Sequence, residues 1–304
     1  IPAKPGIHRI NIAVRELVSY IDWPFFFTAW RMSAKFGNRA FLTNYGGGRE
    51  EWMRQFADSD PEKAEEARHL YSEARRILDE IVSNKDVECK AVVGLFPTFS
   101  TGDSIVVNEE IVFPMLRQQT PNEQGLCLSL ADFVLPQTDG KTDYLGAFAI
   151  TVAVDSLYKN EEDDYRKMLM QSLSDRLAEA SAEYLHEMVR KEYWGYAPNE
   201  NLSAEELFKS HYQGIRPAIG YPSLPDQSLI FDLDKLLNMK ETGITLTETG
   251  AMSPTSSVAG LYFSHPDSQY FMIGKISTEQ FDDYAAESGK SKEYLQQFLI
   301  RNLS

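Results

Sequence analysis

The eleven residues YQGIRPAIGYP, from Tyr212 to Pro222, combine two prolines, two glycines, one cation and two tyrosines. Proline fixes the backbone angle φ, and glycine permits backbone angles or close approaches that a Cβ atom would forbid. Arg216 lies among these four residues and carries five N–H donors. The stretch is therefore interpreted either as a binding loop shaped to hold a carboxylate or as a rigid connector between two apolar faces.

The same loop carries a resemblance to a known family. Its pattern GIRPAxGYP follows YWGYAPNENL (193–202) and precedes YFSHPDS (262–268). Other motifs occur in the family's order along nearly the whole chain: YIDWPFF (20–26), VGLFP (93–97), LADFV (130–134) and DRLAEA (175–180). On these motifs the chain resembles the activation domain of cobalamin-dependent methionine synthase.

The resemblance implies that the chain binds S-adenosylmethionine and supports reductive re-methylation of cobalamin that has been oxidised to the inactive cob(II)alamin state. A flavodoxin-type donor would supply the electron. Such enzymes also have modules that bind cobalamin, methyltetrahydrofolate, and homocysteine with zinc, and none of these has a counterpart in the 304 residues. We therefore expect residues 1–304 to be one activation domain, a C-terminal fragment of the methyltransferase that meets the cobalamin-binding domain in cis and has no turnover in isolation.

Two other interpretations stay open. The chain could be a docking module for a cobalamin domain and a flavodoxin, without a ligand of its own. It could also be a stand-alone protein that serves a separate cobalamin protein.

Length and composition set broad limits on the class of protein. With 43% hydrophobic and 12% aromatic residues, a chain of this length can bury a substantial core. No apolar run approaches the roughly 20 residues that span a bilayer, and the first residues lack the apolar core of a secretory signal. These features predict a cytoplasmic protein without a membrane partner.

The net charge of −15, from 45 acidic and 30 basic residues, argues against a nucleic-acid partner, because phosphate binding needs a basic surface. Flavodoxins are usually acidic as well, so docking one would require a local basic patch. Arg117 and the pair Arg166–Lys167 are candidates for such a patch. The two cysteines, Cys89 and Cys127, lack CxxC spacing and are expected to be buried, reduced thiols.

No metal site is expected, because the histidines lack the spacing of metal ligands and the single ExxH, Glu183 to His186, has no second copy. Surface or capping roles are predicted for these two residues. Neither GxGxxG nor GxxxxGK[ST] occurs, so Gly46–Gly48 is interpreted as a tight loop rather than a phosphate-binding loop.

Hydrophobic periodicity and turn residues place the elements. Helices are predicted at 10–21, 60–84, 162–192, 279–288 and 292–302, with a short helix capped by Ser203 and Glu206. Strands are predicted at 87–96, 104–107, 126–130, 144–154, 244–247, 258–263 and 269–276, the last two joined as a hairpin. This pattern predicts an α+β fold, a single domain with a mixed, mainly antiparallel sheet and flanking helices. The resemblance implies that the domain is curved.

Methyl transfer from a sulfonium to a cobalt nucleophile is an in-line displacement with a neutral leaving group, so positioning supplies the catalysis and no catalytic residue is assigned. The candidate binding residues are Asp22, Glu179, Arg216, Ala218, Tyr221, Tyr270 and Phe271. The resemblance implies that five of them, Asp22, Glu179, Arg216, Tyr221 and Tyr270, sit at positions that correspond to ligand-contacting residues of the family. Arg216 would hold the methionine carboxylate, and its alternative role is a structural ion pair. Asp22 would accept from the ammonium or ribose, or serve only at a helix exit.

Backbone groups near Ala218 would contact the adenine, and Tyr270 and Phe271 would flank the nucleoside, although alternation along a strand turns one of these two rings to the core. Asp175 and Glu179 share a helix face that Glu183 continues, which is also typical of a solvated surface. The resemblance implies that Asp175 serves the interface with the cobalamin module while Glu179 faces the ligand. One departure is Ser210, where the family often has an acid.

Overall fold

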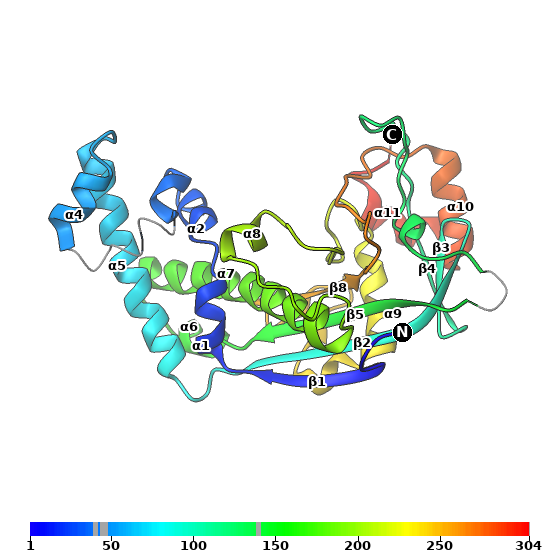
Figure 1. Cartoon of the computed structure of the whole chain (residues 1–304), viewed down its shortest axis with the longest axis horizontal. Helices are drawn as coiled ribbons and strands as arrows, with labels where there is room; N and C mark the ends of the chain where they lie inside the picture. Colours follow the sequence, from blue (N-terminus) through cyan, green and yellow to red (C-terminus); the bar gives the residue numbers. More distant parts are fainter. Residues whose placement is uncertain (39–41, 43–47, 138–140, 304) are drawn as a thin grey trace.

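A long, curved antiparallel sheet runs along the molecule, which a computed structural model describes over residues 1–38, 42, 48–137 and 141–303 (Figure 1). Within this part of the chain the strand order is β4-β3-β2-β5-β8, and β1 also pairs with β2. The six strands are β1 (Gly6–Ile12), β2 (Cys89–Thr101), β3 (Ser104–Val107), β4 (Ile111–Pro114), β5 (Asp143–Val152) and β8 (Ser257–Tyr262). A separate two-stranded ribbon contains β6 (Thr245–Leu246) and β7 (Met252–Ser253).

Strand β2 organises the sheet because it has different neighbours along its length. Its first half pairs with β1, from Ile12 opposite Cys89 to Gly6 opposite Leu95. Its second half pairs with β3, where Thr98 lies opposite Val107. On its other side β5 accompanies it from Val152 to Asp143. The sheet can therefore extend beyond the ends of β1 and β3 while remaining continuous.

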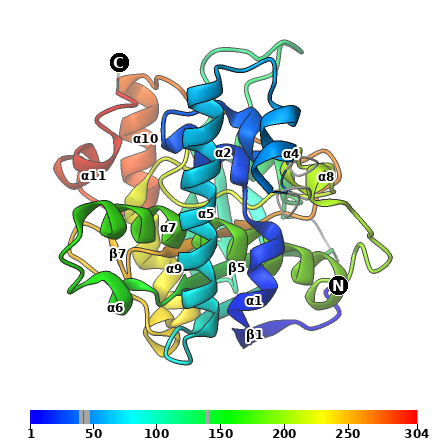
Figure 2. The same ribbon diagram turned by 90° about the vertical axis from the view of Figure 1, so that its left-hand side faces the viewer.

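Both faces of the central strands are buried, so the fold needs a layer on each side. Because side chains alternate between faces, Ala91 and Val93 pack with one cluster while Val92 packs with another. The first cluster contains the apolar faces of α5 (Pro61–Ser83) and α7 (Asp164–Met188), and the second contains α9 (Ile230–Leu237). Figure 2 shows α5 standing across the end of the molecule in front of α7.

The remaining helices gather at the two ends of the sheet (Figure 1). At one end lie α1 (Val14–Leu17), α2 (Trp23–Ala29), α4 (Gly48–Gln55) and α6 (Asp155–Tyr158). At the other end α10 (Thr278–Ser288) and α11 (Lys292–Leu299) build a third apolar cluster. Between the two ends, α8 (Ala204–Phe208) lies above the sheet and next to α7. Short 3-10 turns occur at 18–20, 34–37, 130–133, 227–229 and 239–242.

The α+β class with a curved, mainly antiparallel sheet and flanking helices is confirmed. All strand pairs in the described residues are antiparallel, and parallel geometry is confined there to isolated bridges at Ser100–Pro136 and Ile276–Leu303. Several elements match their predictions closely, including α5, whose cap Asp60 accepts from the backbone N–H of Glu62 at 2.8 Å. Within the part of the chain that the structure describes, no helix is both long and apolar enough to cross a membrane.

Three predicted elements are wrong. Residues 10–21 are not one helix, since 6–12 form an edge strand and only 14–20 are helical. Residues 126–130 and 269–276 are not strands, and no hairpin joins 258–263 to 269–276, because the latter segment leaves the sheet. Strands β4 and β7 and helices α2, α4, α6 and α9 were not predicted. The interpretation of Gly46–Gly48 as a loop lies outside the described residues, except for Gly48, which begins α4.

Candidate ligand-binding cleft

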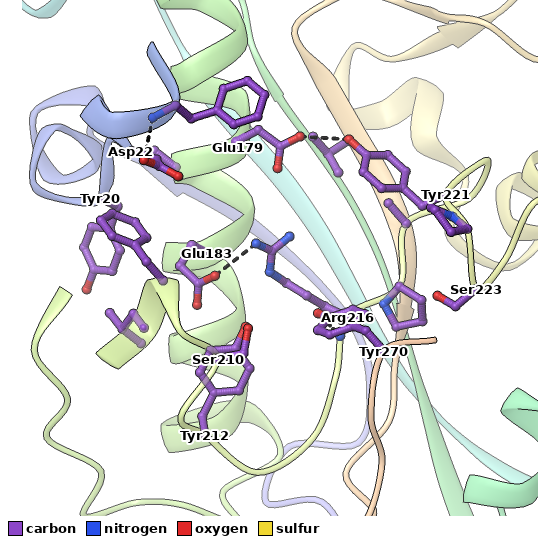
Figure 3. Close-up of a pocket in the computed structure, with 18 of the residues that line it drawn as sticks. Tyr20, Asp22, Glu179, Glu183, Ser210, Tyr212, Arg216, Tyr221, Ser223 and Tyr270 are labelled. Carbon is purple, nitrogen blue, oxygen red and sulfur yellow. Dashed lines mark hydrogen bonds and ion pairs between the residues drawn. The ribbon is translucent and has the colours of Figure 1, made fainter. Parts of the chain in front are cut away.

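A cleft of about 510 Å³ opens between α7 and the loop that follows α8, with the start of α2 on one side and residues 270–271 on the other (Figure 3). Its volume is in the range of small-molecule sites. All seven candidate ligand residues line it, although they come from four distant parts of the chain: Asp22, Glu179, Arg216, Ala218, Tyr221, Tyr270 and Phe271.

Asp22 begins a helix rather than ending one. Its side chain accepts a hydrogen bond of 3.0 Å from the backbone N–H of Phe25 and caps α2. Pro24 sits in the first turn of this helix, where its missing N–H has no carbonyl to pair with anyway. The predicted helix exit at Asp22 is therefore wrong. The cap holds one carboxylate oxygen of Asp22, and the residue lines the cleft.

The loop that carries Arg216 runs beside β8 almost as an additional strand. Ile215 and Phe263 exchange two backbone hydrogen bonds of 3.0 Å, and Leu261 donates to the carbonyl of Pro217 at 3.0 Å. Gly260 makes this approach possible, because a Cβ atom there would lie 2.3 Å from the carbonyl oxygen of Pro217. The binding loop is therefore fixed by the sheet.

Arg216 forms the ion pair that was its alternative role. Its Nη2 lies 3.0 Å from Oε2 of Glu183, and its backbone N–H donates to the hydroxyl of Tyr270 at 3.0 Å. Burial disfavours the charge of Arg216, but the Glu183 carboxylate, together with smaller contributions from Tyr270, Tyr212 and Glu179, outweighs this effect, so the pKa of the guanidinium is raised. Arg216 thus stays protonated, and within the described structure its Nε is buried without a hydrogen-bond partner.

The rim of the cleft is aromatic. Tyr221 and Tyr270 are 51% and 46% exposed, so both rings can be covered by a ligand. The hydroxyl of Tyr221 donates to Oε1 of Glu179 at 3.0 Å, and burial of this tyrosine beside that carboxylate raises the pKa of Tyr221 to about 12. Phe271 packs against the second and third apolar clusters and is the more core-facing ring of the pair Tyr270 and Phe271.

The acidic residues on one face of α7 differ in their exposure to solvent. Asp175 is exposed and lines a smaller hollow of about 270 Å³ that shares Glu179, Ala218 and Tyr221 with the main cleft. Partial shielding from water raises the pKa of Asp175, an effect that Glu179 reinforces and Arg176 opposes. Glu183 is only 5% exposed, so a solvated face is wrong for this residue.

Glu183 and His186 are buried members of a polar cluster, and the predicted surface or capping roles are wrong for both. The His186 ring stacks on Tyr262 with centroids 5.1 Å apart, and burial together with Arg190 and Arg216 holds the pKa of His186 well below its usual range. Sequence reasoning missed Glu183 as a site residue. Its position one helical turn beyond Glu179 was the one available signal, and this spacing does not show that Glu183 is buried.

Of the remaining expectations, which concern Ser210, the two cysteines and the basic residues, the structure confirms only part. Ser210 lines the cleft with a left-handed φ of 54°. Cys89 is buried as expected, but Cys127 is only partly buried. Arg117 is held by Asp103 and Asp132, and Arg166 by Glu80 and Glu161, so neither arginine offers a free positive charge for docking.

The cleft places a protonated guanidinium at its floor, carboxylates on one wall and aromatic rings at its rim. The molecule is thus an α+β domain with a cleft suited to a small, charged, partly flat ligand. A family model described as vitamin B12 dependent methionine synthase, activation domain, matches residues 13–289. A crystal structure of the MetH reactivation domain bound to AdoHcy shares 41% sequence identity with this chain, with a TM-score of 0.87, and the match covers 100% of this chain and 92% of that one. The chain belongs to the family of vitamin B12 dependent methionine synthase activation domains.

Proposed function

We propose that this chain binds S-adenosylmethionine in the cleft and thereby supports the reductive re-methylation of inactive cob(II)alamin in methionine synthase. The observation that carries the proposal is the convergence of all seven candidate residues on one cleft of suitable volume. The similar reactivation domain was crystallised with AdoHcy, which is the demethylated form of S-adenosylmethionine. The two molecules differ only by the methyl group on sulfur, so a site that accepts AdoHcy also fits the adenosine and amino-acid parts of S-adenosylmethionine.

The charges of the cleft match the amino-acid end of the ligand. Arg216 would bind the carboxylate, because Glu183 occupies Nη2 and no other described group hydrogen-bonds Nη1. Glu179 and Asp22 would accept hydrogen bonds from the ammonium and the ribose hydroxyls. Each of these carboxylates has a neighbour within the protein, so its orientation is set before the ligand arrives.

The backbone at Ala218 suits the adenine. The flanking Pro217 carbonyl and Ile219 N–H both bond to β8, so the N–H of Ala218, between them, points to the opposite side. This N–H has no partner among the described residues, whereas the Ala218 carbonyl accepts from Tyr221 at 3.2 Å. Tyr221 and Tyr270 would cover the nucleoside from the rim.

Cobalamin itself would be held by a neighbouring domain in cis, and it supplies the cobalt nucleophile that receives the methyl group. The residues of this chain bind and orient the sulfonium, since displacement at the methyl carbon needs alignment more than proton transfer. Asp175, exposed beside the cleft, would contact the cobalamin-binding domain. A flavodoxin-type electron donor and a cytoplasmic location complete the proposal.

Isothermal titration calorimetry of the purified chain tests the proposal directly. S-Adenosylmethionine and AdoHcy should each bind with one-to-one stoichiometry, while methionine and adenosine alone should bind much more weakly because each occupies only half of the cleft. Absence of binding at millimolar S-adenosylmethionine would contradict the proposal. It would favour a docking module without its own ligand.

A further inference from the structure

Several buried polar atoms without hydrogen-bond partners gather behind Arg216. Within the described structure they are Oε1 of Glu183, both ring nitrogens of His186, Nη1 of Arg190, Nε of Arg216 and the hydroxyl of Tyr262. Buried polar groups are nearly always paired, so a cluster of exceptions requires an explanation. Glu183 and Arg216 line the cleft, whereas His186, Arg190 and Tyr262 are not part of its lining. The charges of Arg190 and Arg216 act on both His186 and Tyr262.

Glu183 lies between two guanidinium groups. Its Oε2 is 3.0 Å from Nη2 of Arg216, and its Oε1 is 4.0 Å from Nη1 of Arg190. Arg190, whose side chain is fully buried, is bound in turn by both oxygens of Glu200, with Nε 2.9 Å from Oε2. The four side chains alternate in sign and sum to zero charge. Such a buried chain is stable only while every member is paired.

The same chain connects two segments that build the cleft. Arg190 lies in the π-helical turn Val189–Tyr193 that continues α7, and wide turns of this kind are frequent at functional sites. Its guanidinium carbon is 4.1 Å from the ring centroid of Tyr212, the first residue of the loop that carries Arg216. The end of α7 and the binding loop are therefore joined through Arg190 as well as through Glu183.

We propose that Glu183 is the positioning residue that orients Arg216 toward the carboxylate of the ligand, and that Arg190 and Glu200 hold Glu183 in place. This inference rests on the proposed function. Glu183 binds Nη2 alone, which fixes the plane of the guanidinium while Nη1 stays available. A free arginine side chain would lose considerable rotamer entropy on binding, and preorganisation removes that cost.

The inference predicts an effect that depends on the ligand's carboxylate. Decarboxylated S-adenosylmethionine keeps the adenosine, the sulfonium and the amine but lacks the group that Arg216 binds. The loss of Glu183 should therefore weaken the binding of S-adenosylmethionine and leave the affinity for the decarboxylated compound unchanged. A residue that only stabilised the fold would change both affinities equally or change neither.

The experiment is calorimetry of both compounds with the wild-type chain, Glu183→Gln and Glu183→Ala, well below each thermal midpoint. For S-adenosylmethionine we expect a loss on the order of tenfold for Glu183→Ala, in line with a hydrogen bond to a charged group, and a smaller loss for Glu183→Gln, whose single amide oxygen can serve only one arginine. For the decarboxylated compound we expect all three proteins to have the same affinity. Asp132→Ala is the matched control, because it removes one of two carboxylates from Arg117, a residue that does not line the cleft.

The outcomes separate the two proposals. Equal weakening of both compounds, unchanged affinities, or tighter binding of S-adenosylmethionine would each overturn the role of Glu183, the last by showing that Glu183 competes with the ligand. If Glu183→Ala does not fold, Glu183→Gln alone decides by the same comparison. If the wild-type chain binds neither compound, the proposed function fails and this inference fails with it.

Discussion

The Oε2 atom of Glu183 on α7 lies 3.0 Å from Nη2 of Arg216, so a buried salt bridge joins the longest helix to the loop at the cleft floor. Both partners are largely buried, with side-chain exposures of 7% and 17%. A pair in this setting is costly to break, because the remaining charge would be left without compensation. The pair therefore couples the stability of the domain to the geometry of its candidate site.

Replacement of Arg216 should separate the roles of charge and shape. Arg216→Ala should weaken S-adenosylmethionine by about tenfold or more, since a hydrogen bond to a charged group is typically worth about 1.5–3 kcal/mol. Arg216→Lys should recover only part of this loss, because an ammonium cannot bond Glu183 and the ligand with one planar fork. Calorimetric titration measures both, with circular dichroism to verify folding. An unchanged affinity in Arg216→Ala would remove this residue from the site.

Gly260 should be sensitive to a single methyl group. In Gly260→Ala the new Cβ would meet the Pro217 carbonyl at 2.3 Å, so the binding loop must move away from β8. We expect a loss of about 1–3 kcal/mol in the free energy of unfolding, as for other overpacked sites, together with weaker ligand binding. Urea titration and calorimetry measure the two effects.

Gly289→Ala is a suitable control for this substitution. Gly289 ends α10 with φ of 65° and has open space around its Cβ position, so it should lose stability without a change in ligand affinity. Similar ligand affinities in Gly260→Ala and the wild type would show that the loop tolerates displacement.

The salt bridge between Arg117 and Asp132 should make stability depend on acid pH. Partial burial of Asp132 tends to raise its pKa, but hydrogen bonds from Arg117 and from the Ser129 backbone outweigh this, and the pKa lies below the ordinary 3.8. A lowered pKa adds stability that is complete above the unfolded-state value and is lost as the pH falls through the folded-state value. The wild type should therefore exceed Asp132→Asn by a constant margin from about pH 7 to 5, and this margin should shrink below about pH 4. Denaturant titrations across this range measure it, and a margin that persists at pH 2 would contradict the assignment.

The two cysteines should differ in reactivity. Burial raises the pKa of Cys89 to about 12, so its thiolate is scarce at neutral pH, whereas Cys127 is only partly buried. With Ellman's reagent at pH 8, the native protein should release colour from one thiol quickly and from the second only after unfolding. The variant Cys127→Ser identifies the reactive residue. Rapid reaction of Cys89 in that variant would show that the sheet opens locally at β2.

The sequence predicted best those elements whose signal is local. Asp60 followed by Pro61 marks the start of α5, and the Ser203–Glu206 capping box marks α8, because both caps are made by residues a few positions apart. The first helix was mispredicted because Ile10 fits a helical stripe with Val14 and Leu17 as well as an alternating strand with Ile12. Only pairing with β2, about eighty residues away along the chain, decides between them.

The candidate site was predicted mainly from the resemblance to a family, whereas the buried polar residues behind Arg216 were not predicted. Arg216 and Tyr221 stood out in a motif and Tyr270 was assigned by its family position, whereas Glu183 appeared as one more acid in a charged helix. The difference is burial, which depends on the tertiary packing of α7 against the loop and β8. No pattern of charges within the helix encodes which turn a distant arginine will meet.

The segments that wall the cleft span from Tyr20 to Phe271, nearly the full length of the chain. A molecule bound there would tie the first helices, the central helix and the last third of the domain together without any covalent bond. Its binding free energy would stabilise the whole domain against one cooperative unfolding transition, rather than stabilising one lobe alone. The domain's resistance to unfolding and proteolysis in a cell would then rise and fall with the concentration of its own methyl donor.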